Sequence, residues 1–189
     1  MLICDELVKK YYSCVAVNKV NMCLEDGRVY ALLGPNGSGK TTLMKMIMGL
    51  IKPTSGSIKL DGEVLSTASK ANITYMPTES YFYSYMTIKD IVTFYKDSYR
   101  DFSESRFYDM LGRMGLQFTD KVKNMSTGML AKLKIAVALA RDSRIIMLDE
   151  PLNGIDILAR EVIINAIRAN AAADVPSLCQ ATLLTSWRP

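Results

Sequence analysis

The sequence predicts an α/β fold built on a mainly parallel sheet, with an antiparallel β part at the N-terminus and an inserted helical subdomain. Strand-like apolar runs alternate with segments of helical periodicity, a pattern typical of a parallel sheet packed against helices. An aromatic-rich stretch, residues 80–124, interrupts this alternation. The chain of 189 residues is 49% hydrophobic and 22% charged, which suffices for one core with a small insertion.

The N-terminal part is predicted to be rich in β-structure. Residues 2–12 and 13–24 have the character of two strands, and a turn at 25–27 leads to a third strand over 28–33. Residues 57–65 predict a hairpin, because an Asp-Gly pair stands between alternating residues at its centre.

A helix is predicted over residues 40–51. Leu43, Ile47 and Leu50 recur at helical spacing and would share one face toward the core. Pro53 follows and would stop the helix, since proline cannot continue the hydrogen-bond ladder.

The middle and C-terminal parts continue the pattern. Residues 71–77 end as a strand, and helix-start signals inside the insertion fall at Thr87 and Ser103. The expected elements after the insertion are a helix over 126–141, a buried strand over 144–148 and a helix over 155–169. Beyond about residue 171 the periodicity is lost, and only ATLLTS, residues 181–186, could form a strand.

Residues Gly34–Thr41 match the pattern G-x-x-x-x-G-K-[ST] at every fixed position. Glycines let the backbone curl so that successive N–H groups form an anion nest at a helix N-terminus. A predicted strand precedes the loop and a predicted helix follows it, so we interpret it as the phosphate-binding loop of a P-loop NTPase fold. A glycine-rich turn without a ligand is the alternative. The expected phosphate ligands are Asn36, Gly37, Ser38, Gly39, Lys40, Thr41 and Thr42.

Within this loop, Lys40 would reach the β- and γ-phosphates, and the hydroxyl of Thr41 would bind Mg²⁺. A second motif, RIIMLDE, is an apolar strand that ends in Asp149 and Glu150. Its carboxylates would lie at the carboxyl edge of the sheet, where such folds bind ligands. Asp149 would hold Mg²⁺, and Glu150 would polarise the attacking water. Without the phosphate loop, the same pattern is equally a surface turn.

Composition excludes several other classes of protein. The net charge of +4 is modest, and its lysines and arginines form no run that would make a nucleic-acid arm. No apolar run reaches the length of a membrane span, so membrane contact is expected to go through another protein. The cysteines have no CxxC or metal-binding spacing, which favours reduced thiols in a cytosolic protein. They are Cys4, Cys14, Cys23 and Cys179.

Over roughly residues 1–170 the chain resembles the ATP-binding subunits of ABC transporters. The resemblance rests on GPNGSGKTT followed, in the family's order, by NMSTGMLAKLKIAVALARDSRIIMLDEPLNGID. It implies that Mg²⁺ and ATP are bound and that ATP is hydrolysed at the interface of a head-to-tail dimer. The implied partners are a separate membrane permease and a second ATPase subunit, identical or related. The implied location is the inner, cytoplasmic face of the cell membrane, as a peripheral subunit of the bacterial export type.

The resemblance also assigns residues outside the loop. Ser126 and Gly128 lie in the family's signature, where Thr127 and Met129 depart from the usual Ser-Gly-Gly-Gln. The family's signature binds the γ-phosphate of ATP held by the other subunit, whereas from the residues alone Ser126 is a helix N-cap. Asp156 would align the sites across the dimer. An acid at a helix start is also favoured by the helix dipole.

Tyr11 occupies the position of the family's adenine-stacking aromatic residue, and Tyr12 beside it is the alternative. Stacking on a base is tolerant of sequence, because every base offers a flat apolar face. The resemblance divides the chain into two halves of a nucleotide-binding core around the insertion. The expected divisions are 1–79 for the first half, 80–124 for the helical subdomain, 125–170 for the second half and 171–189 for an atypical tail.

Departures from the family's pattern bear on catalysis. Thr78 and Glu79 stand where the family has a glutamine that touches Mg²⁺ and water. Trp187 stands near the place of a histidine that contacts the γ-phosphate, and the chain contains no histidine. Family members also continue for several tens of residues beyond this point. We therefore expect either a short, degenerate natural protein or an altered C-terminus, with an open sheet edge and a tendency to self-associate.

Three functional hypotheses follow. The first is an ATPase subunit that drives a permease, and the second is a nucleotide-binding module with little or no hydrolysis. The third is an ABC-type ATPase acting on nucleic acid or ribosomes, which would be expected to carry paired nucleotide domains or a basic arm. The aromatic stretch from Tyr81 could dock a membrane partner or form the core of the helical subdomain. Tyr81, Phe82 and Tyr83 are expected to be its most exposed members.

Overall fold

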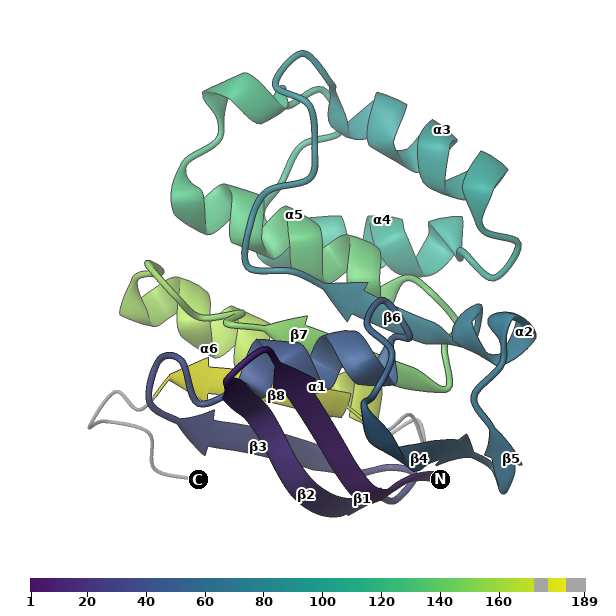
Figure 1. Cartoon of the computed structure of the whole chain (residues 1–189). Coiled ribbons are helices and arrows are strands. Elements are labelled where there is room, and N and C mark those ends of the chain that lie inside the picture. Colours follow the sequence, from purple (N-terminus) through teal and green to yellow (C-terminus); the bar gives the residue numbers. More distant parts are fainter. Residues whose placement is uncertain (172–176, 183–189) are drawn as a thin grey trace.

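The computed structural model describes residues 1–171 and 177–182. Its strands form two four-stranded sheets, with strand orders β2-β1-β4-β5 and β3-β8-β7-β6. Figure 1 shows the antiparallel sheet at one end of the molecule, helices α3, α4 and α5 at the other, and the parallel sheet between them. The predicted α/β class, with an N-terminal antiparallel part and a helical insertion, is confirmed.

The first sheet is antiparallel. Its strands are β1 (Leu2–Tyr11), β2 (Cys14–Leu24), β4 (Ser55–Leu60) and β5 (Glu63–Val64). Strand β1 pairs with β2 on one side and β4 on the other. The hairpin predicted around Asp61 and Gly62 is confirmed as β4 and β5. Both turn residues have positive φ, as the tight turn requires.

The second sheet is parallel in every pairing. Its strands are β3 (Val29–Gly34), β6 (Ile73–Met76), β7 (Ile145–Asp149) and β8 (Ser177–Thr182). All carboxyl ends therefore meet at one edge, where the loop after β3 and Asp149 at the end of β7 both lie. Strand β8 separates β3 from β7. With neighbouring strands about 4.8 Å apart, the ends of β3 and β7 are roughly 10 Å apart.

The position of β8 corrects the strand expected over residues 181–186. The strand begins at Ser177 and shares only its last residues with that expectation. It is an inner strand paired on both sides, so its bounds follow from long-range pairing rather than from a local apolar pattern. The remainder of ATLLTS, and Trp187, lie outside the described residues.

Helix α1 (Lys40–Ile47) packs between the two sheets. Its side chains Leu43, Met44 and Ile47 join buried residues of β1, β4 and β7 in one core cluster. The predicted helix over 40–51 is too long at its C-terminal end. Gly49 takes a left-handed φ of 70°, which ends the helix, and Leu50 is 63% exposed instead of facing the core.

The remaining helices belong mainly to the insertion and the second half. They are α2 (Thr67–Lys70), α3 (Ile88–Ser98), α4 (Glu104–Met114), a 3₁₀ turn (Val122–Asn124), α5 (Thr127–Leu139) and α6 (Ile157–Ala171). The predicted helix starts are confirmed: the side chains of Thr87, Ser103 and Ser126 each accept a backbone N–H of the following turn. Helix α5 ends at Leu139, earlier than the predicted Arg141.

A second core cluster surrounds α5. Over its C-terminal half this helix is buried on all sides, with Lys134 as the one charged residue, and it packs against α3, α4, α6 and the parallel sheet. The aromatic stretch divides between core and surface. Tyr83 and Tyr85 are exposed and stack with ring centroids 5.5 Å apart, whereas Phe82, expected to be exposed, packs against the cluster. Tyr81 is 38% exposed, but its hydroxyl is directed inward.

Candidate functional site

The loop between β3 and α1 has the backbone shape that a glycine-rich anion nest requires. Gly37 and Gly39 have φ values of 80° and 90°, in the left-handed region that favours glycine. A Cβ on Gly39 would lie 2.0 Å from the carbonyl oxygen of Ala16, so no other residue fits there. Residues 36–38 are exposed at the tip of the loop. The loop therefore offers its backbone to solvent at the carboxyl edge of the sheet.

The side chain of Lys40 is buried and contacts the backbone of the loop. This side chain is 7% exposed, and its Nζ donates to the carbonyl oxygens of Gly34 at 2.8 Å and Pro35 at 2.9 Å. Among the described residues, no side chain caps the N-terminus of α1. The positive end of the helix dipole thus faces the loop, as in anion-binding helix termini. Thr41 and Thr42 lie in the first turn of this helix, and both are half-buried.

Asp149 is the last residue of β7 and is 2% exposed. The hydroxyl of Tyr75 donates to its Oδ2 at 2.9 Å. Its Oδ1 is buried and has no hydrogen-bond partner within residues 1–171 and 177–182. A buried carboxylate oxygen without a partner is costly, and a bound cation would remove that cost. Burial and the neighbouring Asp149 carboxylate raise the pKa of Tyr75.

Glu150 follows in a strained conformation. Its φ of 50° lies in the left-handed region, which costs a non-glycine residue about 1–2 kcal/mol. The side-chain amide of Asn153 donates to Glu150 Oε2 at 3.0 Å, which orients the carboxylate. Such strain persists when the surrounding structure holds the residue in place, and it often marks a functional position.

The segment after β6 is tied to Asp149 through Thr78 and Lys134. The Thr78 hydroxyl donates to the main-chain oxygen of Asp149 at 3.3 Å, and the Nζ of Lys134 donates to the Thr78 carbonyl at 2.7 Å. Burial lowers the pKa of Lys134, and the Asp149 charge opposes that effect. Glu79 lies exposed next to Thr78.

Ser126, Gly128 and Asp156 form a second group of predicted residues. Ser126 caps α5 by accepting the Met129 N–H at 3.2 Å. Asp156 caps α6, since its Oδ1 accepts the Ala159 N–H at 2.9 Å. A Cβ on Gly128 would lie 3.7 Å from the other oxygen of Asp156, so the structure brings the starts of α5 and α6 together.

The aromatic pair at the end of β1 is exposed. Tyr11 is the last residue of β1 and is 40% exposed, with the Nζ of Lys9 5.0 Å from its ring centroid. Tyr12 lies in the turn to β2 with a φ of 46° and is fully exposed. Both rings are accessible, so the choice of Tyr11 as the stacking residue stays a prediction.

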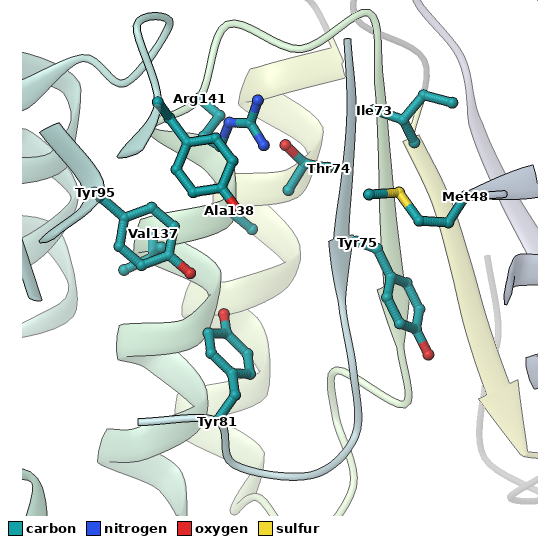
Figure 2. Close-up of a pocket in the computed structure, with 10 residues that line it drawn as sticks. Met48, Ile73, Thr74, Tyr75, Tyr81, Tyr95, Val137, Ala138 and Arg141 are labelled. Atoms are coloured by element: carbon teal, nitrogen blue, oxygen red, sulfur yellow. The ribbon is translucent and has the colours of Figure 1, made fainter. Parts of the chain in front are cut away.

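A small cavity lies apart from the loop, between α5, β6 and the aromatic residues of the insertion (Figure 2). Its volume is about 60 Å³, and its lining includes Thr74, Tyr81, Tyr95, Tyr99 and Arg141. The hydroxyls of Tyr81 and Tyr95 point toward each other in Figure 2, and burial raises the pKa of both groups. This space suits water molecules and is too small for a nucleotide.

Three residues that contact Asp149, Thr78 or Glu150 are not predicted from the sequence. They are Tyr75, Lys134 and Asn153. Lys134 left one signal, because it is a charged residue inside the apolar run LKIAVALA. Tyr75 and Asn153 have no such signal in the sequence, since only the fold brings them to their hydrogen-bond partners.

Within the described ranges, no group of three or more His, Cys, Asp or Glu side chains could hold a metal. A carboxylate and a hydroxyl, together with the phosphates of a nucleotide, would be a donor set that suits Mg²⁺.

Within residues 1–171 and 177–182, no helix combines the length and apolar character needed to cross a membrane.

The family model described as ABC transporter matches residues 17–153. The lantibiotic transport ATP-binding protein SrtF of Streptococcus pyogenes is 38% identical over 161 residues, covering 82% of this chain and 69% of SrtF. The ABC transporter ATP-binding protein YtrB of Bacillus subtilis is 33% identical over 171 residues, covering 89% of this chain and 57% of YtrB.

Solved structures share the fold. The ATP-binding subunit of an ABC transporter superposes with a TM-score of 0.86 at 24% identity, covering 98% of this chain and 80% of that chain. MJ0796, described as a dimeric bacterial ABC transporter cassette, gives a TM-score of 0.83 at 23% identity over 96% of this chain and 88% of its own. At these identities the structures establish the fold, and the family model and curated relatives establish the family. The chain belongs to the family of ABC transporter ATP-binding proteins.

Proposed function

We propose that this chain binds Mg²⁺ and ATP in the loop Gly34–Thr41 and hydrolyses the ATP to drive a separate membrane permease. The observation that carries the proposal is the buried Asp149 carboxylate with an unpartnered oxygen, at the same sheet edge as the glycine loop. That edge combines an anion nest with a site for a cation. A nucleotide with a bound metal ion fits both, because its phosphates are negative and the metal is positive.

Each predicted residue has a role in this proposal. The backbone N–H groups of residues 36–39 hold the phosphates, and Lys40 turns from the loop carbonyls toward the β- and γ-phosphates. Thr42 adds a donor at the start of α1, and Tyr11 stacks on adenine. Lys40 is suited to this exchange, because its present acceptors are neutral carbonyls and a phosphate is a stronger acceptor for an ammonium.

Thr41 and Asp149 would hold Mg²⁺, directly or through water. The fit rests on the unpartnered Oδ1 of Asp149 and on the hard oxygen donors that Mg²⁺ prefers. Bound there, the metal supplies charge neutralisation between the phosphates. Glu150 would orient the attacking water and accept its proton as the bond to the γ-phosphorus forms, with ADP leaving. Asn153 keeps the Glu150 carboxylate in place.

The group Ser126, Gly128 and Asp156 would serve a second nucleotide. The capped start of α5 offers donors to an anion, and a γ-phosphate held by the opposite subunit of a head-to-tail dimer has the required charge. Either an identical chain or a related ATPase subunit would complete that dimer. A dimeric cassette of the same fold, MJ0796, supports this arrangement.

The proposed partner is a membrane permease, and the proposed location is its cytoplasmic face. The relatives are ATP-binding proteins of transporters, and the exposed Tyr83 and Tyr85 on the helical part offer an apolar contact surface. Nucleic acid is not a proposed partner, because the net charge of +4 is small and dispersed.

A second candidate is a nucleotide-binding module with little or no turnover. The chain has no histidine, and the Thr78 hydroxyl at the position of the family's glutamine is bonded to the Asp149 carbonyl. Loss of one preorganised transition-state contact commonly costs about 10²–10³ in rate.

Phosphate release from Mg²⁺ and ATP separates the two candidates, with Glu150→Gln as the blank. Release above the blank supports hydrolysis by this chain with Glu150 as the base. Bound ATP with rates equal to the blank identifies the binding module instead, and absence of ATP binding overturns both.

A further inference from the structure

Lys134 is a buried cation in the middle of an apolar helix. It lies in α5 between Leu133 and Ile135, which are both fully buried, and its own side chain is 6% exposed. Lysine is rarely buried unless its ammonium has partners, because moving a charge out of water is costly. Its presence here therefore requires a compensating partner.

The first partner of Lys134 is the turn after β6. Its Nζ donates to the main-chain oxygen of Thr78 at 2.7 Å, and the Thr78 hydroxyl in turn donates to the main-chain oxygen of Asp149. The ring of Tyr81 lies 6.0 Å from the same Nζ. Helix α5, the end of β6 and the end of β7 are thus joined at one point.

The second partner is the charge of Asp149. Its Oδ2 accepts only a neutral hydroxyl, that of Tyr75, and its Oδ1 has no partner in the described part of the chain. Thr78 bridges Lys134 to the backbone of Asp149, and burial lowers the pKa of Lys134 while the Asp149 charge raises it. Two opposite charges that are both buried stabilise one another, since the interior screens them weakly.

We propose that the Lys134 ammonium is the counter-charge of the Asp149 carboxylate while no metal is bound, and that it links α5 to the end of β7 through Thr78. Because Ser126 caps the start of α5, this link connects the nucleotide edge of the sheet to the helix that would contact a second nucleotide. The inference rests on the proposed function only in taking Asp149 as a metal ligand.

The first test is a thermal-unfolding cycle without nucleotide or metal, using Lys134→Met, Asp149→Asn and the double variant. Lys134→Met leaves a buried carboxylate without its counter-charge and should lower the melting temperature. Adding Asp149→Asn should restore at least half of that loss, because the neutral amide needs no counter-charge. Lys132→Met is the matched control, since Lys132 donates to Met114 and should combine additively with Asp149→Asn.

Lys134→Gln and Lys134→Arg separate charge from hydrogen bonding and keep the test decisive if the Met variant does not fold. Gln keeps a donor without the charge, so it should also be rescued by Asp149→Asn, whereas Arg should need no rescue. Additive effects of Lys134→Gln and Asp149→Asn would overturn the counter-charge role.

The second test is the Mg²⁺ concentration that gives half-maximal binding of a fluorescent ATP analogue. The Lys134 ammonium and the metal repel each other near Asp149, so Lys134→Met should lower this concentration by about tenfold or more. Lys134→Arg and Lys132→Met should leave it within about twofold. An unchanged or raised midpoint in Lys134→Met would overturn the proposal. If no variant binds the analogue, the proposed function fails, and the unfolding cycle still decides the role of Lys134.

Discussion

At the scale of single residues, backbone geometry restricts the phosphate loop as strongly as side-chain chemistry does. Gly39 combines a left-handed φ with a backbone carbonyl that leaves no space for a Cβ. Glu150 also has a left-handed φ, but unlike glycine it carries a side chain. The end of β7 and the hydrogen bond from Asn153 hold Glu150 in this conformation.

Gly39→Ala should destabilise the protein and abolish ATP binding. The new methyl group would meet the Ala16 carbonyl at 2.0 Å, in addition to the cost of about 1–2 kcal/mol for a left-handed alanine. Gly62→Ala is the control, since Gly62 has a similar φ of 87° with open space around it. Urea unfolding should show a clearly larger loss for Gly39→Ala, and equal losses would contradict the predicted clash.

Cys4 should be unreactive toward thiol reagents in the folded protein. Burial raises the pKa of its thiol to about 12, so almost no thiolate forms near neutral pH. Cys14 and Cys23 are exposed and should react rapidly in a Cys179→Ser background. Colorimetric thiol titration should show Cys4 reacting only after denaturant is added. Rapid reaction of Cys4 in buffer would contradict its burial in the antiparallel sheet.

The sequence predicts the shape of the loop, because its glycines follow from a local backbone requirement, and the left-handed φ of Gly37 and Gly39 agrees with that shape. The sequence also predicts the place of Asp149 and Glu150, because a buried strand must end at the sheet edge, and their roles stay predictions. Tyr75 and Lys134 could not be placed in the same way. Their partners stand 74 and 56 residues away, so only the folded arrangement brings them together.

At the scale of elements, a buried arginine joins the helical insertion to the sheet. Arg141 forms a bidentate pair with Asp101, donates to the Ala71 carbonyl at 2.8 Å and lies 4.0 Å from the ring centroid of Tyr99. These partners come from the end of α3, the connection to α4 and the start of β6. The insertion is therefore fixed to the core at the end of α5.

Arg141→Met should cost about 3 kcal/mol of unfolding free energy. Breaking a buried pair typically costs about 3–5 kcal/mol, and partial solvation of Asp101 favours the lower end. Arg106→Met is the comparison, because its pair with Asp142 is exposed and should contribute under about 1 kcal/mol. Chemical denaturation measures both, and a similar small loss in the two variants would contradict the anchoring role.

Helix starts were predictable because capping is local: Thr87, Ser103 and Ser126 each bond within their own turn. Helix ends were less predictable. The spacing of Leu50 continued the apolar face of α1, but the left-handed Gly49 ended the helix first. Strand β8 was misplaced because its bounds depend on pairing with β3 and β7, which are distant in sequence.

At the scale of the whole molecule, the two groups of predicted site residues lie on different parts of one chain. The loop and Asp149 belong to the edge of the parallel sheet, and Ser126, Gly128 and Asp156 belong to the adjoining starts of α5 and α6. A nucleotide held between two such chains would use one group from each, as the proposed head-to-tail dimer requires.

The most direct test is isothermal titration of ATP into the wild-type chain and Lys40→Met, with Lys45→Met on the same helix as the control. We expect saturable binding by the wild type and Lys45→Met. The Lys40 variant should bind about 10–100-fold more weakly, because a charged hydrogen bond to phosphate contributes about 1.5–3 kcal/mol. Equal affinity of the wild type and Lys40→Met, or no binding by the folded wild type, would contradict the assignment of this loop as the phosphate site.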